Sequence, residues 1–253
     1  MQIDLAGRTA LVTGATGQLG RTITRTLAGC GADMIVHYHG NRAKGEELTK
    51  ELRDQGRRVY LVQADVTDAA SVEAMRAHIQ NETGLPDIIV NNAVIQYGWK
   101  SVLEQAIEDY DSQYRSCVAH NVLMAKAFVP AMIEKKWGRV IGINTECAMQ
   151  CFPGQSAYVA GKRGMDGVLR ILAKEVGKHN ITVNQVAPGY MVSDNQREAG
   201  TEVNEGYTKN VPLGRRGDDQ DIANAVAFLA SDLADFITGV YLPVCGGYVM
   251  PTI

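Results

Sequence analysis

The segment Arg8-Thr-Ala-Leu-Val12 and the turn after it, Thr13-Gly14-Ala-Thr-Gly17-Gln-Leu-Gly20, decide the fold of this 253-residue chain. The first five residues are β-prone and predict a short strand, while Arg21 to Ala28 predicts a helix that closes at Gly29. A strand, a glycine-rich turn and a helix can bind a pyrophosphate, because glycines let the backbone approach it and the helix N-terminus offers free N–H groups. An ordinary strand-to-helix turn is the alternative, but its position in the first βα unit favours a nucleotide.

Strand-like and helix-like patterns alternate along the whole chain without a linker or a repeat. The expected strands are Thr9–Thr13, Met34–Tyr38, Val59–Gln63, Ile88–Asn91, Arg139–Asn144, Thr182–Ala187 and Val240–Pro243. The expected helices include, after the first, Arg42–Gln55, Ala69–Glu82, Tyr114–Lys135, Ala157–His179 and Gln220–Ser231. This alternation predicts one α/β domain over residues 1–253, with a Rossmann-like, doubly wound, mostly parallel seven-stranded sheet and helices on both faces. Ligands of such sheets bind beyond the carboxyl ends of the strands.

Composition narrows the possible partners. The formal net charge is −3 and the pI is about 6.0, so we expect no nucleic-acid partner and no attraction to acidic lipid. The best apolar run, Val118 to Ile133, is interrupted by polar residues and Pro130, so we expect no membrane-spanning segment. We also expect no signal peptide and five reduced cysteines, as in a cytoplasmic protein. Cys147 and Cys151 have no neighbouring histidine to complete a ligand set, so no metal site is expected.

The stretch Tyr158-Val-Ala-Gly-Lys162 sets a phenol and an ammonium four residues apart. In a helix these positions share one face, so the two groups can act on one substrate atom. A free tyrosine has a pKa near ~10. A nearby lysine cation favours the phenolate and lowers that pKa, which makes the tyrosine a usable acid or base. The same spacing also occurs where both side chains simply reach into solvent.

Taken together, the motifs resemble the single-domain short-chain dehydrogenase/reductase family, of the type of 3-oxoacyl-acyl-carrier-protein reductases and related carbonyl reductases. The resemblance covers nearly the whole chain, and the matching segments occur in the order and at the spacing of that family. They are the glycine turn, Ala64-Asp-Val66, Asn91-Asn-Ala93, His120-Asn-Val122, Tyr158 with Lys162, Val183 to Gly189, Pro212 to Arg216, Phe228 to Asp232, Thr238-Gly239 and Gly246-Gly-Tyr248.

The resemblance implies the catalytic residues. Tyr158 is then the acid/base that exchanges a proton with the substrate oxygen, and Lys162 lowers the Tyr158 pKa and holds the nicotinamide ribose. Asn121 resembles an asparagine that positions a water in a proton relay to that lysine, although it can equally be a helix-interior residue satisfied by a neighbouring carbonyl. Thr145 stands thirteen residues before Tyr158, where the family usually has a serine that polarises the substrate carbonyl. A strand-end threonine chosen for β-propensity is the alternative there.

The resemblance also implies the cofactor site. Asp65 looks like the carboxylate that accepts from the adenine amino group, or else it caps the next helix. Asn92 and Ala93 border a ribose, and Pro188-Gly189 walls the nicotinamide pocket. The full set of expected cofactor residues is Gly14, Thr16, Gly17, Gln18, Leu19, Gly20, Tyr38, His39, Asn41, Arg42, Asp65, Val66, Asn92, Ala93, Tyr158, Lys162, Pro188, Gly189, Met191 and Ser193.

Four positions depart from the family pattern. Gln18 stands where the glycine turn usually has its middle glycine, so that the glycine spacing is closer to that of sugar-nucleotide-modifying relatives. Val94 replaces a glycine after the fourth strand and adds bulk near the cofactor. Thr145 replaces the serine but keeps a hydroxyl donor. Cys245 replaces an acidic residue before Gly246, which is expected to affect the C-terminal region rather than the reaction.

The end of the second strand indicates the cofactor. An enzyme that uses NAD usually has an acidic residue there, which holds the adenosine 2′-hydroxyl and repels a 2′-phosphate. Here the position is Tyr38, and Arg42 with His39 can meet a phosphate. NADP(H) is therefore favoured and NAD(H) remains possible, since Gly17 occupies a turn position where many NADP enzymes have a basic residue.

The expected function is an NADP(H)-dependent interconversion of a ketone and a secondary alcohol. Residues 190–211 correspond to a substrate lid in the family, and their polarity favours a polar carbonyl or sugar-like substrate over a steroid or a long acyl chain. The helices Tyr114–Lys135 and Ala157–His179 correspond to those that relatives pair in a homotetramer. Two alternatives stay open: a nucleotide-binding regulator with impaired catalysis, suggested by the departures, and an epimerase or lyase that uses nicotinamide, suggested by the glycine spacing.

Overall fold

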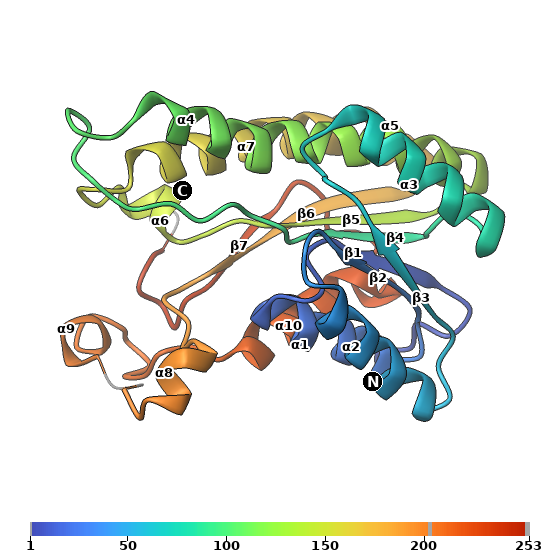
Figure 1. Ribbon diagram of the computed structural model, residues 1–253, viewed down its shortest axis with the longest axis horizontal. Coiled ribbons are helices and arrows are strands. Elements are labelled where there is room, and N and C mark those ends of the chain that lie inside the picture. The colour runs from blue at the N-terminus through green and yellow to red at the C-terminus, as the bar shows by residue number, and fades with distance from the viewer. Residues whose placement is uncertain (1, 202–203, 251–253) are drawn as a thin grey trace.

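A seven-stranded sheet runs through the centre of the protein, as the computed structural model shows (Figure 1). The structure describes residues 2–201 and 204–250. The strand order is β3-β2-β1-β4-β5-β6-β7, and every neighbouring pair is parallel. The strands are β1 Thr9–Val12, β2 Asp33–Tyr38, β3 Val59–Gln63, β4 Ile88–Asn91, β5 Gly138–Ile143, β6 Ile181–Pro188 and β7 Tyr241–Val244. The predicted seven-stranded, doubly wound fold is confirmed, and the sheet is parallel throughout rather than mostly parallel.

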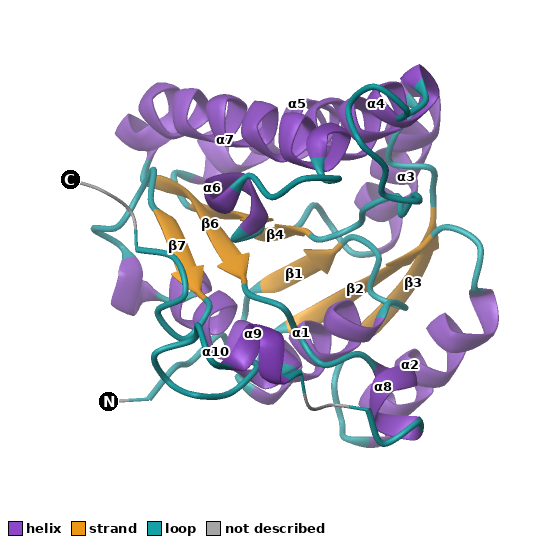
Figure 2. Ribbon diagram, turned by 90° about the vertical axis from the view of Figure 1, so that its left-hand side faces the viewer, coloured by secondary structure: helices purple, strands orange, loops and turns teal. Residues whose placement is uncertain are grey.

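Helices cover both faces of the sheet (Figures 1 and 2). One layer packs α1 Gln18–Gly29, α2 Arg42–Asp54 and α10 Asp219–Ala230 against the sheet. The other contains α3 Ala69–Glu82, α4 Ile107–Gln113, α5 His120–Lys135 and α7 Ser156–Val176. Short helices α6 Cys147–Gln150, α8 Asp194–Glu198 and α9 Glu205–Thr208 lie beyond the strand ends, and 3₁₀ turns cover Gly177–His179 and Asp232–Ala234.

Most predicted boundaries agree with the observed ones to within two residues, but one helical segment starts earlier than predicted. The expected helix Tyr114–Lys135 is preceded by α4, so that helical structure begins at Ile107. Residues Tyr114–Ala119 form a π-helical turn between α4 and α5. Such turns are rare and often occur at functional sites, and this one brings Ser116 to the cavity described below.

The combined helix Ile107–Lys135 meets the criteria of a membrane span by length and composition alone, with a mean hydropathy of 1.3 over its best window. The expectation that no segment would do so is therefore wrong. Half of that window is buried inside the protein, and α5 packs against α3, α7, β4 and β5. The apolar side chains of this helix thus belong to the core of one helical layer.

The topology places the functional site. The strand order reverses between β1 and β4, where the connections leave toward opposite edges of the sheet. The central strands β4 and β5 are buried on both faces, so most of their side chains pack in the core and only their carboxyl ends can reach a ligand. A ligand therefore has access to the sheet at the carboxyl ends of the strands, in the crevice beside the reversal.

Candidate active site

A cavity of about 870 Å³ opens at the carboxyl ends of β1, β4, β5 and β6. It runs from the glycine turn to Tyr158 and Lys162 on α7. Most of the sequence-predicted site residues line it: Gly14, Thr16, Gly17, Gln18, Leu19, Gly20, His39, Asn41, Asp65, Val66, Asn92, Ala93, Thr145, Tyr158, Lys162, Pro188, Gly189 and Met191. Tyr38, Arg42, Asn121 and Ser193 are not among the lining residues.

The glycine turn has a shape that only small residues permit. Gly14 has φ +62°, and a Cβ atom on Gly20 would lie 2.2 Å from the carbonyl oxygen of Gly14. Helix α1 begins directly after Gly17, whose position gives the helix no side-chain cap. Its first N–H groups therefore remain available to an anion, and the positive end of its dipole faces the same space. The turn fits a pyrophosphate.

His37 supports this turn, and the sequence analysis missed it. Its Nδ1 accepts from the backbone N–H of Gly14 (3.0 Å), and its Nε2 lies 3.1 Å from the carbonyl oxygen of Ala64. The pair requires the neutral ring with its proton on Nε2. Burial lowers the pKa of His37 to about 4, so the ring stays neutral and the turn stays anchored at physiological pH.

Asp65 lines the cavity at the end of β3. Its Oδ1 accepts from the backbone N–H of Thr67 (2.8 Å) and from the Thr67 hydroxyl (2.7 Å). Burial works against the charged carboxylate, but these hydrogen bonds and nearby histidines lower the Asp65 pKa overall. The alternative that Asp65 caps the next helix is wrong, because Asp68 is the N-cap of α3 and accepts from Ser71.

The end of β2 presents His39 and Asn41 to the cavity, while Tyr38 and Arg42 lie outside its lining. Arg42 begins α2 with a side chain that is 73% exposed and paired with Glu46 one turn along the helix (2.8 Å). The Tyr38 ring lies beside Gly45. Their assignment to the cofactor stays a prediction, which for Arg42 requires its side chain to leave Glu46.

Tyr158 and Lys162 share the inner face of α7, as their spacing predicts, and the Lys162 Nζ lies 5.7 Å from the Tyr158 ring centroid. The Lys162 ammonium is buried and donates to the carbonyl oxygen of Ile143 (2.6 Å). The loop after β4 orients Tyr158, because the Tyr97 hydroxyl accepts from the backbone N–H of Tyr158 (2.7 Å). Trp99 also stacks beside its ring, with centroids 6.3 Å apart.

The electrostatics of Tyr158 differ from the expectation. Burial raises the pKa of the Tyr158 phenol above its ordinary value, the neighbouring Cys147 adds to this, and the Thr145 side chain acts in the opposite direction. Burial also lowers the pKa of the Lys162 ammonium. The expected lowering of the Tyr158 pKa by Lys162 is therefore wrong, because burial disfavours both the Tyr158 phenolate and the Lys162 ammonium.

Thr145 follows β5 and lies beside Tyr158 in the cavity lining. Its hydroxyl oxygen accepts from the backbone N–H of Cys147 (3.2 Å). Because that bond uses a lone pair, the hydroxyl proton is still able to point elsewhere. Tyr241 donates to the Thr145 carbonyl oxygen and holds this part of the chain from β7. Thr145 can thus offer one hydrogen bond to a group bound next to Tyr158.

Asn121 is buried, and neighbouring groups engage its side-chain amide. Its Nδ2 donates to the carbonyl oxygen of Cys117 (2.7 Å), and its Oδ1 accepts from Asn91 (2.7 Å). This is the arrangement expected of a helix-interior asparagine satisfied by the carbonyl four residues earlier. These contacts fix the π-helical turn against β4, while the role of Asn121 in a proton relay stays a prediction.

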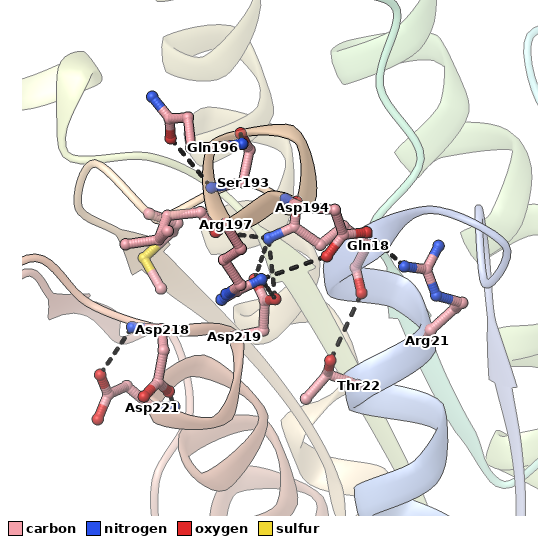
Figure 3. Close-up of polar contacts among 12 residues, drawn as sticks. Gln18, Arg21, Thr22, Ser193, Asp194, Gln196, Arg197, Asp218, Asp219 and Asp221 are labelled. Carbon is pink, nitrogen blue, oxygen red and sulfur yellow. Dashed lines mark hydrogen bonds and ion pairs between the residues drawn. The ribbon is translucent and has the colours of Figure 1, made fainter. Parts of the chain in front are cut away.

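The lid region, residues 190–211, carries α8 and α9, and its positions 202 and 203 lie outside the described residues. Gln18 binds the beginning of this lid (Figure 3). Its Nε2 donates to the Val192 carbonyl oxygen (2.7 Å) and to the Asp219 carboxylate (2.8 and 2.9 Å). Its Oε1 accepts from the backbone N–H of Asp194 (2.8 Å). A glycine at position 18 has no side chain to make these contacts.

Ion pairs surround Gln18 and extend the same contact (Figure 3). Arg21 on α1 binds Asp194 (2.5 Å), and Arg197 lies 3.2 Å from both Asp194 and Asp219. Two arginines thus face two carboxylates between α1, α8 and the start of α10. The departure from the family pattern at position 18 therefore has a structural consequence: the side chain joins the glycine turn to the lid.

Arg216 ends the segment Pro212 to Arg216, which resembles the family, but the sequence did not indicate what its side chain contacts. Arg216 stacks on the Tyr190 ring (3.9 Å) and donates to the carbonyl oxygens of Tyr190 and Met191, so it holds the lid's first residues. Like His37 and Tyr97, it acts through residues distant along the chain. Of the departures, Val94 lines the cavity as expected, and Cys245 packs against Gly189.

Comparison with known proteins agrees with this geometry. The model of a protein family described as enoyl-(acyl carrier protein) reductase matches residues 14–249. The 3-oxoacyl-(acyl-carrier-protein) reductase of Escherichia coli (strain K12) is 38% identical over 248 residues, which cover 98% of this chain and 100% of that protein. The corresponding reductase of Staphylococcus aureus (strain Mu50) is 36% identical over 243 residues, which cover 96% of this chain and 98% of that protein.

Solved structures resemble the whole fold. A gluconate 5-dehydrogenase from Burkholderia cenocepacia J2315, in complex with NADP and tartrate, superimposes with a TM-score of 0.90 at 29% identity, covering 98% of this chain and 97% of that one. A blue fluorescent protein from a metagenomic library, in complex with NADPH, gives a TM-score of 0.89 at 30% identity, covering 98% of this chain and 100% of that one.

Proposed function

Because the chain belongs to the short-chain dehydrogenase/reductase family of oxidoreductases, we propose that it interconverts a ketone and a secondary alcohol with NADP(H) as cofactor. The observation that carries this proposal is the meeting of Tyr158, Lys162 and Thr145 in one cavity with the glycine turn. The turn fits a pyrophosphate, and the three side chains can bind and protonate an oxygen. Hydride donation or acceptance is the chemistry that the bound nicotinamide supplies.

The residues of the chain supply the proton and the orientation. Tyr158 passes its phenolic proton to the substrate oxygen during reduction and receives it back during oxidation. The phenol is protonated at neutral pH, which is the form that reduction needs, and burial raises its pKa further in the same direction. Thr145 donates a hydrogen bond to the same oxygen as negative charge develops on it. Lys162 and the wall Pro188-Gly189 position the cofactor beside them.

We propose a small polar carbonyl compound as the substrate. The loop after β4 and the lid line the cavity with an amide and a phenol, those of Gln96 and Tyr190, and the Tyr97 hydroxyl binds the backbone of Tyr158 beside it. Tartrate, which is bound in the gluconate 5-dehydrogenase structure, is a small polar hydroxy acid and so matches the size and polarity of the proposed substrate, although it has no ketone group.

Cofactor choice follows from the end of β2. No acidic side chain stands at Tyr38 to repel a 2′-phosphate, and two of the structural relatives hold NADP or NADPH. The exposed Arg42 side chain can turn from Glu46 toward a phosphate and form charge-assisted hydrogen bonds. Such bonds contribute about 1.5–3 kcal/mol, which is roughly a tenfold to hundredfold preference.

The test combines activity and affinity. A panel of small polar ketones and aldehydes should oxidise NADPH faster than NADH, as followed by nicotinamide absorbance. Arg42→Ala should weaken NADPH binding about tenfold to hundredfold in a fluorescence titration and leave NADH binding nearly unchanged. Lys50→Ala is the matched control, because it removes a similar ion pair with Asp54 on the same helix. Tighter binding of NADH than NADPH by the unaltered protein would contradict the cofactor proposal.

We also propose a homotetramer that uses the outer faces of α5 and α7. A shallow groove of about 430 Å³ lies between these helices, lined by Val122, Ala125, Lys126, Gly167, Val168, Ile171, Leu172 and Glu175. Ile171 is 57% exposed there, an unfavourable position for a large apolar side chain in a monomer.

Light scattering at micromolar concentration should therefore give the mass of a tetramer. Ile171→Glu places a charge in the apolar contact and should shift the protein to dimers or monomers. Gln55→Glu, an equally acidic change at an exposed site beyond α2, should leave the mass unchanged. A monomeric unaltered protein would rule out this assembly.

A further inference from the structure

A buried carboxyl group directly follows Thr145. Glu146 is only 3% exposed, and its backbone N–H donates to the Pro188 carbonyl oxygen (2.9 Å). Its Oε1 accepts from the Tyr207 hydroxyl (2.8 Å), whereas its buried Oε2 has no hydrogen-bond partner among the described residues. Burying a carboxyl group with one unpaired oxygen is costly, so a specific contact is needed to offset that cost.

Tyr207 connects this carboxyl group to the lid. It lies on α9, and its hydroxyl oxygen also accepts from the backbone N–H of Tyr190 (2.9 Å). The hydroxyl sits so close to Gly189 that a Cβ atom there would lie 2.7 Å away. The Tyr207 ring meets Tyr190 edge-on, with centroids 5.5 Å apart, and Tyr248 in the same way at 4.9 Å. One phenol thus joins the ends of β5 and β6 to the lid.

We propose that Glu146 is a positioning residue that holds the lid closed over the substrate side of the cavity through Tyr207. This inference rests on the proposed function and adds a residue to it. Glu146 does not line the cavity, so it acts through its neighbours: Thr145 before it, Pro188 bonded to its backbone and Tyr190 reached through Tyr207. When Tyr207 is docked on Glu146, the wall formed by Pro188, Gly189 and Tyr190 faces Thr145 at a set distance.

The burial of the Glu146 carboxyl group makes lid closure depend on pH. Burial raises the pKa of Glu146 to about 7, against the hydrogen bonds from Tyr207 and the backbone at Tyr190. A carboxyl group with a raised pKa stabilises the closed form while it is protonated, and that stabilisation is lost as the pH rises through about 7. The titratable groups around it are Cys147 on its own segment, Tyr207 on α9 and Cys245 behind Tyr207. Burial raises the pKa of Cys147 and that of Tyr207, so neither ionises first.

The variants separate the lid contact from the chemistry. Tyr207→Phe removes the hydroxyl and should raise the KM of the best carbonyl substrate of the panel about tenfold, with a much smaller change in kcat and unchanged NADPH affinity. Glu146→Gln keeps an acceptor for Tyr207 and mimics the protonated acid, so its KM should not change between pH 6 and 8.5. The KM of the unaltered protein should rise several-fold over that range. Tyr248→Phe, which removes a hydroxyl from the same aromatic cluster, should match the unaltered protein.

Hydrogen exchange of residues 204–211 with NADPH bound tests the lid without any substrate, and it should be faster in Tyr207→Phe than in the unaltered protein or in Tyr248→Phe. If exchange and KM are unchanged in Tyr207→Phe, or if Glu146→Gln keeps the pH dependence of KM, the assignment of Glu146 is wrong. Faster lid exchange in a protein that reduces no carbonyl compound would instead count against the proposed function alone.

Discussion

Tyr158→Phe should abolish nearly all turnover while NADPH still binds with close to its normal affinity. The change removes a single oxygen from a ring that Trp99 stacks on and Tyr97 holds by the backbone, so the site should keep its shape. Without the phenolic proton, the substrate oxygen has no acid to neutralise it as the hydride arrives. Steady-state rates with the best carbonyl substrate, alongside a fluorescence titration of NADPH, measure the two effects separately.

Lys162→Ala provides the comparison for this result. Its ammonium is buried and donates to the carbonyl oxygen of Ile143. We propose that it binds the cofactor ribose and also supports the proton transfer. We therefore expect Lys162→Ala to reduce both the rate and the affinity for NADPH. A Tyr158→Phe protein with near-normal activity on its true substrate would contradict the proposed mechanism. A loss of activity caused by unfolding of a variant would be recognised from its lowered Tm.

Thr145→Ala should lower kcat by about 10²–10³, because it removes a hydrogen-bond donor aimed at the developing oxyanion. Thr145→Ser keeps the hydroxyl, the acceptor for the Cys147 N–H and the residue type usual in the family, so it should stay close to the unaltered rate. The comparison is informative since both variants lose the same γ-methyl group. The measurement is kcat and KM for each variant with saturating NADPH.

Equal rates for the serine and alanine variants would show that Thr145 is a structural residue at the end of β5 and that another group polarises the carbonyl. NADPH affinity should not change in either variant. The Tyr241 contact to the Thr145 carbonyl oxygen is a backbone contact, so both substitutions preserve it.

The fold could be predicted from the sequence because its signals are local. Alternation of strand and helix patterns requires only the period of apolar residues, and Gly14 and Gly20 are needed by the turn itself. The spacing of Tyr158 and Lys162 fixes their common face through helix geometry alone. The start of the helix at Ile107 was missed, since its first turn carries the acidic residues Glu108 and Asp109 and has no apolar period.

Tertiary structure decided everything that depends on residues distant in the chain. His37 reaches Gly14 across two neighbouring strands, and Gln18 reaches Asp194 and Asp219 from the other end of the sequence. Nothing in the sequence distinguishes Glu146 from other acidic residues, because its contact with Tyr207 forms only when α9 packs against the end of β5. The raised pKa of Tyr158 likewise comes from desolvation, which is a property of the assembled cavity. The order of residues thus determined the sheet, the turn and the common face of Tyr158 and Lys162, whereas side-chain contacts and burial, which exist only after the layers have packed, determined the charge states and the contacts of the lid.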